Sequence, residues 1–152
     1  MAPDVELDKQ LEETIKNFLA KNPNYDRSKL VSKGANIGGA YGYRADLGIT
    51  LRSNLEANYA RILKHQGVQF VYEPKVFTLS NGKVYIPDFY LPKTDEYVEV
   101  KGFFKARDHD KYAVFSADYP NIRWRVVVQT SPEWKAMRKK YKRYIPTWEG
   151  TH

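Results

Sequence analysis

Residues 85–102 read YIPDFYLPKTDEYVEVKG and place three charged side chains among strand-forming residues. Asp88 follows a proline, Glu99 comes eleven positions later, and Lys101 stands two positions beyond Glu99. Charged side chains are rarely buried without partners, because desolvating an unpaired charge costs several kcal/mol or more. The stretch therefore predicts either an exposed polar strand face or three side chains that converge on something that stabilises them.

The spacing of these charges favours convergence. Because side chains alternate along a strand, Glu99 and Lys101 share one face while Val100 takes the other. Pro87 indicates a strand edge or bulge, and a distortion there would turn Asp88 toward Glu99. Two close carboxylates repel unless a cation joins them, and hard oxygen ligands suit Mg²⁺ or Mn²⁺. The pattern is typical of metal-assisted phosphodiester hydrolysis, whereas a charged outer strand face would explain the E-x-K triplet alone.

The composition predicts one soluble globular domain with a cationic body. The chain has 152 residues, no cysteine, and no window with the roughly eighteen consecutive apolar residues of a membrane span. We expect a cytoplasmic protein without a membrane partner, located in the host cytoplasm if the protein is viral. The net charge is +7, and residues 1–20 carry five acids against two lysines, so residues 21–152 carry +10. Such a body favours a polyanionic partner such as nucleic acid.

The chain divides into three parts by sequence pattern. Residues 1–31 contain an amphipathic helix over 5–20, which we interpret as an appendage that packs on a partner subunit. Residues 32–49 are rich in glycine, so we predict a flexible connector. Residues 50–146 alternate helical and strand patterns, with Asn81-Gly82 as a hairpin turn. The expected fold class is α/β, a mixed β-sheet flanked by helices, with an N-terminal helical appendage.

Two segments together carry a family resemblance. PDFYLP (87–92) and YVEVKG (97–102) resemble the acidic motif of the PD-(D/E)xK nuclease superfamily, which implies a restriction-endonuclease-like core. LRSNLEANYARILKHQGVQFVYEP (51–74), followed by those strands, is similar to the phage endonuclease I family of junction-resolving nucleases. The similarity covers residues 50–130 and includes the order and spacing of the segments. It implies a Mg²⁺-dependent endodeoxyribonuclease in which Mn²⁺ can substitute.

The resemblance also implies a role for each residue of the acidic motif. Asp88 and Glu99 would bind the metal ion directly, and the backbone carbonyl of Val100 would supply a further oxygen ligand. Glu56, on the helix before the sheet, would support a second metal ion or a water bound to the metal. Lys101 would position the attacking water or stabilise charge that develops on the phosphoryl oxygens.

Glu56 has a second interpretation that requires no catalysis. With Ser53 it forms the S-x-x-E capping box, in which the glutamate bonds the backbone N–H of the capping residue. Both interpretations remain open from the sequence. Three weaker site candidates, each also explained by an ordinary structural role, are Glu73, His109 and Gln129.

Basic residues outside the acidic motif are candidates for contacts with DNA phosphates. The last predicted helix, which begins after Ser131, carries six cations with no acid between residues 134 and 144. A solvated helix face is the alternative explanation for this run. The full set of candidate DNA-binding residues is Arg52, Lys105, Arg107, Lys111, Lys135, Arg138, Lys139 and Lys142.

The sequence shows no element that would read bases. It contains no zinc finger, no clear helix-turn-helix and no GxxxxGK loop, so we also expect no nucleotide cofactor. Specificity would then depend on the shape of the DNA, for example a branch. Resolving a branched four-way junction requires two symmetric cuts, which predicts a homodimer. Two alternatives remain, namely a phage nicking or homing-type endonuclease on linear duplex DNA and a non-catalytic nucleic-acid-binding protein with the same fold.

Overall fold

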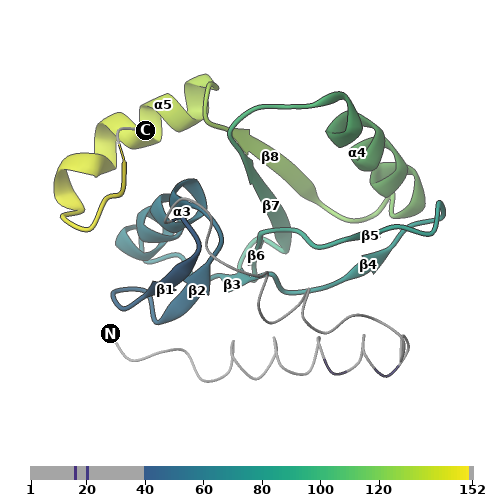
Figure 1. Ribbon diagram of the computed structural model, residues 1–152, viewed down its shortest axis with the longest axis horizontal. Helices are drawn as coiled ribbons and strands as arrows, with labels where there is room; N and C mark the ends of the chain where they lie inside the picture. The colour runs from purple at the N-terminus through teal and green to yellow at the C-terminus, as the bar shows by residue number, and fades with distance from the viewer. Residues whose placement is uncertain (1–15, 17–19, 21–39, 151–152) are drawn as a thin grey trace.

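The computed structural model describes Lys16, Ala20 and residues 40–150 of the chain (Figure 1). The predicted appendage over 1–31 lies outside the described residues, apart from Lys16 and Ala20, which are helical and exposed. None of the helices in the described ranges is long and apolar enough to cross a membrane. The elements follow in the order β1 (Gly42–Arg44), β2 (Ile49–Leu51), α3 (Asn54–His65), β3 (Val71–Tyr72), β4 (Phe77–Thr78), β5 (Val84–Tyr85), β6 (Phe89–Leu91), β7 (Glu96–Lys101), α4 (Ala106–Asp118), β8 (Trp124–Val128), α5 (Pro132–Tyr141) and the 3₁₀ turn η1 (Lys142–Tyr144).

A four-stranded sheet in the order β3-β6-β7-β8 organises the molecule. β6 pairs antiparallel with β3 and β7, whereas β8 joins β7 in parallel after the crossover through α4. Helices α3 and α5 pack with one face of the sheet, and α4 packs with the other (Figure 1). The predicted α/β class, a mixed sheet flanked by helices, is confirmed.

Local signals set the ends of two helices. Ser53 caps α3, and its hydroxyl oxygen accepts the backbone N–H of Glu56 at 3.1 Å. Ser131 caps α5 in the same way, accepting the N–H of Trp134 at 3.2 Å, and Pro132 is the first helical residue. Both N-termini lie where the sequence predicts them.

The hairpin β4–β5 forms a small sheet of its own beside α4. Gly82 adopts the left-handed backbone that its tight turn requires, with φ at 82°, and the Lys83 N–H donates to the Asn81 side chain at 3.0 Å. Phe77 and Phe115 lie in the core between the hairpin and α4 and are fully buried. The predicted hairpin is confirmed, but it pairs with none of the four strands of the main sheet.

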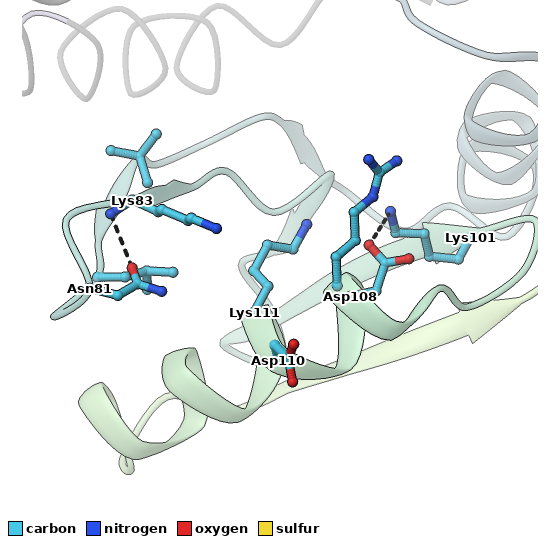
Figure 2. Close-up of a pocket in the computed structure, with 9 residues that line it drawn as sticks. Asn81, Lys83, Lys101, Asp108, Asp110 and Lys111 are labelled. Carbon is cyan, nitrogen blue, oxygen red and sulfur yellow. Dashed lines mark hydrogen bonds and ion pairs between the residues drawn. The ribbon is translucent and has the colours of Figure 1, made fainter.

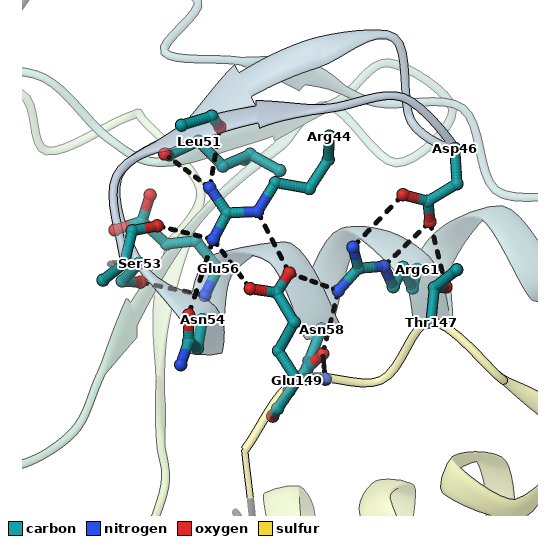
Figure 3. A network of polar contacts seen from close by, with 12 residues as sticks. Arg44, Asp46, Leu51, Ser53, Asn54, Glu56, Asn58, Arg61, Thr147 and Glu149 are labelled. Carbon is teal, nitrogen blue, oxygen red and sulfur yellow. Dashed lines mark hydrogen bonds and ion pairs between the residues drawn. The ribbon is translucent and has the colours of Figure 1, made fainter. Parts of the chain in front are cut away.

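Residues 42–51 form an ordered hairpin, although they overlap the flexible connector that the sequence predicts over 32–49. Arg44 is 7% exposed and donates to the carbonyl oxygens of Gly42 and Leu51 at 2.7 and 3.1 Å. Its guanidinium also donates twice to the carboxylate of Glu149, at 3.0 and 2.9 Å (Figure 3). This part of the prediction is wrong because the partner lies 105 positions away, beyond the reach of a local glycine pattern.

The segment around Glu149 fastens the β1–β2 hairpin to α3. The backbone N–H of Glu149 donates to the side-chain oxygen of Asn58 at 3.0 Å, and the backbone carbonyl of Glu149 accepts the side-chain N–H of Asn58 at 2.8 Å. Asn58 is fully buried. Arg61, itself buried, donates to Glu149 at 2.6 Å and to Asp46 at 2.8 Å (Figure 3). Although burial opposes it, bonding to Arg44 and Arg61 holds the pKa of Glu149 below its ordinary value. The Glu149 carboxylate is therefore shared by two buried guanidinium groups, and Asp46 supplies a second acid for Arg61.

Replacing Glu149 with alanine should destabilise the fold by about 2–3 kcal/mol, because it leaves buried cations without that partner. Glu133→Ala is the matched control, since its pair with Arg125 is largely exposed and should cost less than about 0.5 kcal/mol. Denaturant titration measures both. Because the pKa of Glu149 is lowered on folding, its contribution is present at neutral pH and lost as pH falls below about 4.5. Equal losses in the two variants would contradict this assignment.

Candidate active site

The pairing of β6 with β7 brings Asp88 and Glu99 together. Phe89 faces Val98 in the antiparallel register, so one further position along the ladder sets Asp88 opposite Glu99. The Val100 N–H donates to Asp88 Oδ2 at 2.7 Å and holds that carboxylate against β7. These are the two carboxylates that the sequence predicts to converge.

The pair carries negative charge in a poorly solvated place. Glu99 is 5% exposed, and Asp88 is partly buried. Desolvation, followed by repulsion from Glu99 and then from Glu56, raises the pKa of Asp88 well above its ordinary value. Within residues 40–150, neither Asp88 nor Glu99 forms an ion pair with a lysine or arginine. The site therefore gains stability from any cation that enters it.

Tyrosine hydroxyls surround the acids, and sequence reasoning missed them. Tyr112, on α4, donates to Glu99 Oε2 at 3.3 Å, and Tyr72, on β3, donates to Glu56. Burial and then the charge of Glu99 raise the pKa of Tyr85, so its hydroxyl stays protonated as a donor. These tyrosines come from separate elements, and no spacing in the sequence connects them with the acids.

Glu56 belongs to the helix cap and reaches the sheet as well. Its backbone N–H bonds Ser53, while its carboxylate accepts the Tyr72 hydroxyl. Burial is the largest influence on the pKa of Glu56 and raises it, while the Tyr72 hydroxyl opposes that rise and the charge of Glu73 adds to it. The capping position therefore does not exclude Glu56 from the acidic site. Glu56 acts on Asp88 electrostatically, because its charge raises the pKa of Asp88.

The acids do not converge as a set of three direct ligands. No group of three His, Cys, Asp or Glu side chains in the described part of the chain is arranged to hold a metal ion. Asp88 and Glu99 nevertheless fit Mg²⁺, which is commonly held by one or two carboxylates and keeps several waters. Val100 lies between Glu99 and Lys101 on β7, and its backbone carbonyl is a further hard oxygen donor. Two unneutralised carboxylates side by side suit such an ion.

Lys101 lies on the same strand as Glu99 and is oriented by an acid of its own. Its ammonium nitrogen is 3.3 Å from Asp108 Oδ1, and Asp108 also accepts the Lys105 N–H at 3.0 Å. Although burial opposes it, the Lys105 N–H and the Lys101 charge lower the pKa of Asp108. Asp108 thus fixes the start of α4 and the position of Lys101 together.

Three weaker candidates take up different positions. Gln129 directly follows β8, and its N–H donates to the carbonyl of Lys101, the last residue of β7, at 2.8 Å. His109 lies on α4, and its ring stacks on that of Phe104, which precedes the helix. Glu73 forms a bidentate ion pair with Arg52, with one contact at 2.8 Å. Gln129 adjoins Lys101, and Glu73 adjoins Asp88, whose carbonyl accepts the Glu73 N–H at 2.7 Å.

The basic candidates fall into separate groups. Arg52, predicted to contact DNA, is paired with Glu73, and this pair links the start of α3 with the end of β3. Three candidates lie at or within the first turns of α4, close in sequence to Lys101, and these are Lys105, Arg107 and Lys111. Four lie on α5 and η1, across the sheet from α4, and these are Lys135, Arg138, Lys139 and Lys142.

Comparison with known proteins identifies relatives of this chain. The sequence model of the phage endonuclease I family matches residues 37–148. The protein named Endodeoxyribonuclease 1 of Enterobacteria phage T3 is 32% identical over 99 residues, which is 62% of this chain and 64% of the relative. The match therefore spans somewhat less than two thirds of that relative's length.

Asp88→Asn should stabilise the protein at neutral pH without divalent ions by about 1 kcal/mol, because it removes one of two close like charges. The asparagine oxygen still accepts the Val100 N–H. Mg²⁺ should raise the midpoint of thermal unfolding of the natural protein but not that of Asp88→Asn. At about 100 times the dissociation constant the gain is about 2.7 kcal/mol. Asp95→Asn, which changes an exposed acid, is the control, and an equal Mg²⁺ response in all three proteins would refute the site.

Proposed function

The chain belongs to the phage endonuclease I family, and on this basis we propose that it is a DNA endonuclease that hydrolyses phosphodiester bonds with the help of Mg²⁺. The observation that carries the proposal is the pair formed by Asp88 and Glu99 at the end of β6 and on β7, with Lys101 on the same strand. A family match alone would not say which residues act. The position of the acidic pair supports the assignment of Asp88 and Glu99.

The motif and the sheet support a PD-(D/E)xK site on a restriction-endonuclease-like core. Asp88, Glu99 and the Val100 carbonyl would hold the ion, and Mn²⁺ should substitute because it prefers the same hard ligands. Glu56 would act through a water rather than as a direct ligand, since its carboxylate already accepts a hydrogen bond from Tyr72. The ion, when bound, would neutralise charge on the phosphate and lower the pKa of water.

The residues of the chain would divide the remaining work between them. Lys101, oriented by Asp108, would donate to a phosphoryl oxygen or hold the attacking water in line. Tyr112 would keep Glu99 in place through its hydroxyl. Preorganised donors of this kind stabilise charge that develops in the transition state without having to reorganise.

Asp88→Ala and Lys101→Ala should each lower the rate of DNA cutting in Mg²⁺ by about 10³-fold or more, while binding to DNA in Ca²⁺ persists. Gel-based cleavage assays and fluorescence anisotropy measure the two properties separately. Lys93→Ala is the control and should cut normally, because Lys93 lies on the exposed turn that joins β6 to β7, at the other end of these strands from Asp88 and Glu99. If the natural protein binds DNA but cuts no form of it in Mg²⁺ or Mn²⁺, the chain is a non-catalytic DNA-binding protein instead.

We further propose that the enzyme selects branched DNA and acts as a homodimer. Two features of the sequence support this proposal: it contains no clear base-reading motif, and residues 51–102 resemble the junction-resolving nucleases. Symmetric cutting of a four-way junction needs two active sites related by a two-fold axis. The basic residues of α4 and α5 would track phosphates on the arms.

A synthetic four-way junction should be cut at least about tenfold faster than a linear duplex with the same arm sequences. The uncut complex in Ca²⁺ should have the mass of two protein chains, as measured by light scattering. Equal cutting of the junction and the duplex would favour the nicking or homing-type alternative. A single protein chain per junction would argue against the dimer.

A further inference from the structure

We propose that the pocket between the β4–β5 hairpin and α4 binds a DNA phosphate that neighbours the one being cut. Lys83, Arg107 and Lys111 would be its ligands. The inference rests on the proposed function, because Lys101 contributes both to this pocket and to the site where cutting would occur. It adds a strand-holding position that the acidic motif does not contain.

The pocket has a volume of about 350 Å³ and opens between two elements (Figure 2). The hairpin supplies Asn81 and Lys83, and α4 supplies Arg107 and Lys111. Lys101 lines it from the end of β7, together with its partner Asp108. In Figure 2 the side chains of Lys83, Lys111 and Lys101 extend into the same space.

The charges of the lining favour an anion. Four cations line the pocket against two acids, Asp108 and Asp110, and Asp108 is already bonded to Lys101 and to the Lys105 N–H. In residues 40–150, none of Lys83, Arg107 and Lys111 forms an ion pair. Three cations in one concavity repel each other, so an anion that enters would remove this repulsion.

The cations are held by rigid surroundings. Lys83 follows the tight turn, where its carbonyl accepts the Leu79 N–H at 2.8 Å. Two bonds fasten the hairpin to α4, from the Tyr119 hydroxyl to the Thr78 carbonyl and from the Ser80 N–H to Asp118, both at 2.7 Å. A pocket that is formed before binding loses less entropy when its ligand arrives.

Two tyrosines separate the pocket from the acidic pair. The Lys111 nitrogen lies 5.0 Å from the ring centre of Tyr85 and 5.1 Å from that of Tyr112. Tyr112 donates its hydroxyl to Glu99, so the rings that contact Lys111 lie beside the acids, although they do not line the pocket themselves. A phosphate in the pocket would therefore belong to the same strand as a phosphate at Glu99, a short way along the backbone.

The lining favours a backbone phosphate over a free nucleotide. The pocket is lined by no aromatic side chain on which a base could stack, and its apolar lining consists of Leu79 and Val84, both from the hairpin. Lysine binds phosphate as a point charge, and arginine adds paired donors. A phosphodiester with its adjoining deoxyribose matches this combination of cations and small apolar contacts.

The test couples one side chain with one phosphate. DNA with a single neutral methylphosphonate, moved along the strand on both sides of the cutting position, is titrated in Ca²⁺ against the natural protein, Lys83→Ala and Lys83→Arg. Lys83→Ala should weaken binding to unmodified DNA about 5–10-fold and reduce the salt dependence by about one counter-ion. With the methylphosphonate at one particular phosphate, Lys83→Ala should cost nothing further, and Lys83→Arg should bind almost normally.

Lys93→Ala controls for the loss of a positive charge, since Lys93 lies on an exposed turn outside the pocket. Additive losses at every phosphate, or equal losses for Lys83→Ala and Lys93→Ala, would overturn the phosphate site while leaving cutting intact. If the protein cuts no DNA but Lys83 still couples to one particular phosphate in the binding assay, the proposed function fails and the phosphate site stands. If the natural protein binds no DNA, both proposals fail.

Discussion

The backbone ladder between β6 and β7 forces two carboxylates together, and the acidic end of the sheet depends on that constraint. The register of Phe89 with Val98 leaves Asp88 no position except opposite Glu99, and the Val100 N–H fixes it there. Hydrogen bonds distributed along the sheet thus hold a local arrangement that electrostatics alone would disperse. Sites that work against stability in this way are commonly functional.

The cations near this site are arranged so that they do not neutralise the pair. Arg52 is bound by Glu73, and Lys101 is bound by Asp108, so each has an acid other than Asp88 or Glu99. Glu99 accepts the Tyr112 hydroxyl and Asp88 accepts the Val100 N–H instead, and both of these donors are neutral. This separation leaves the negative charge of the pair available to the metal ion that we propose, and it keeps the Lys101 ammonium group close to the pair.

Local signals in the sequence predict much of this structure. The helix caps at Ser53 and Ser131 and the turn at Asn81-Gly82 each depend on a few neighbouring residues, and all three form as expected. Asp88 and Glu99 were predictable because eighteen consecutive residues contain both strands and their alternation.

Long-range partners were not predictable from one sequence. No sequence pattern connects Asp108 with Lys101, which it orients, or Lys83 with α4, which it faces across the pocket. Arg44 falls within the predicted flexible connector, because the partner that orders it, Glu149, follows 105 residues later in the sequence. That separation has a consequence during synthesis on the ribosome: the β1–β2 hairpin emerges about 105 residues before the carboxylate that its buried guanidinium bonds. Until Glu149 has been synthesised, this edge of the nascent domain is exposed, and a chaperone could bind it.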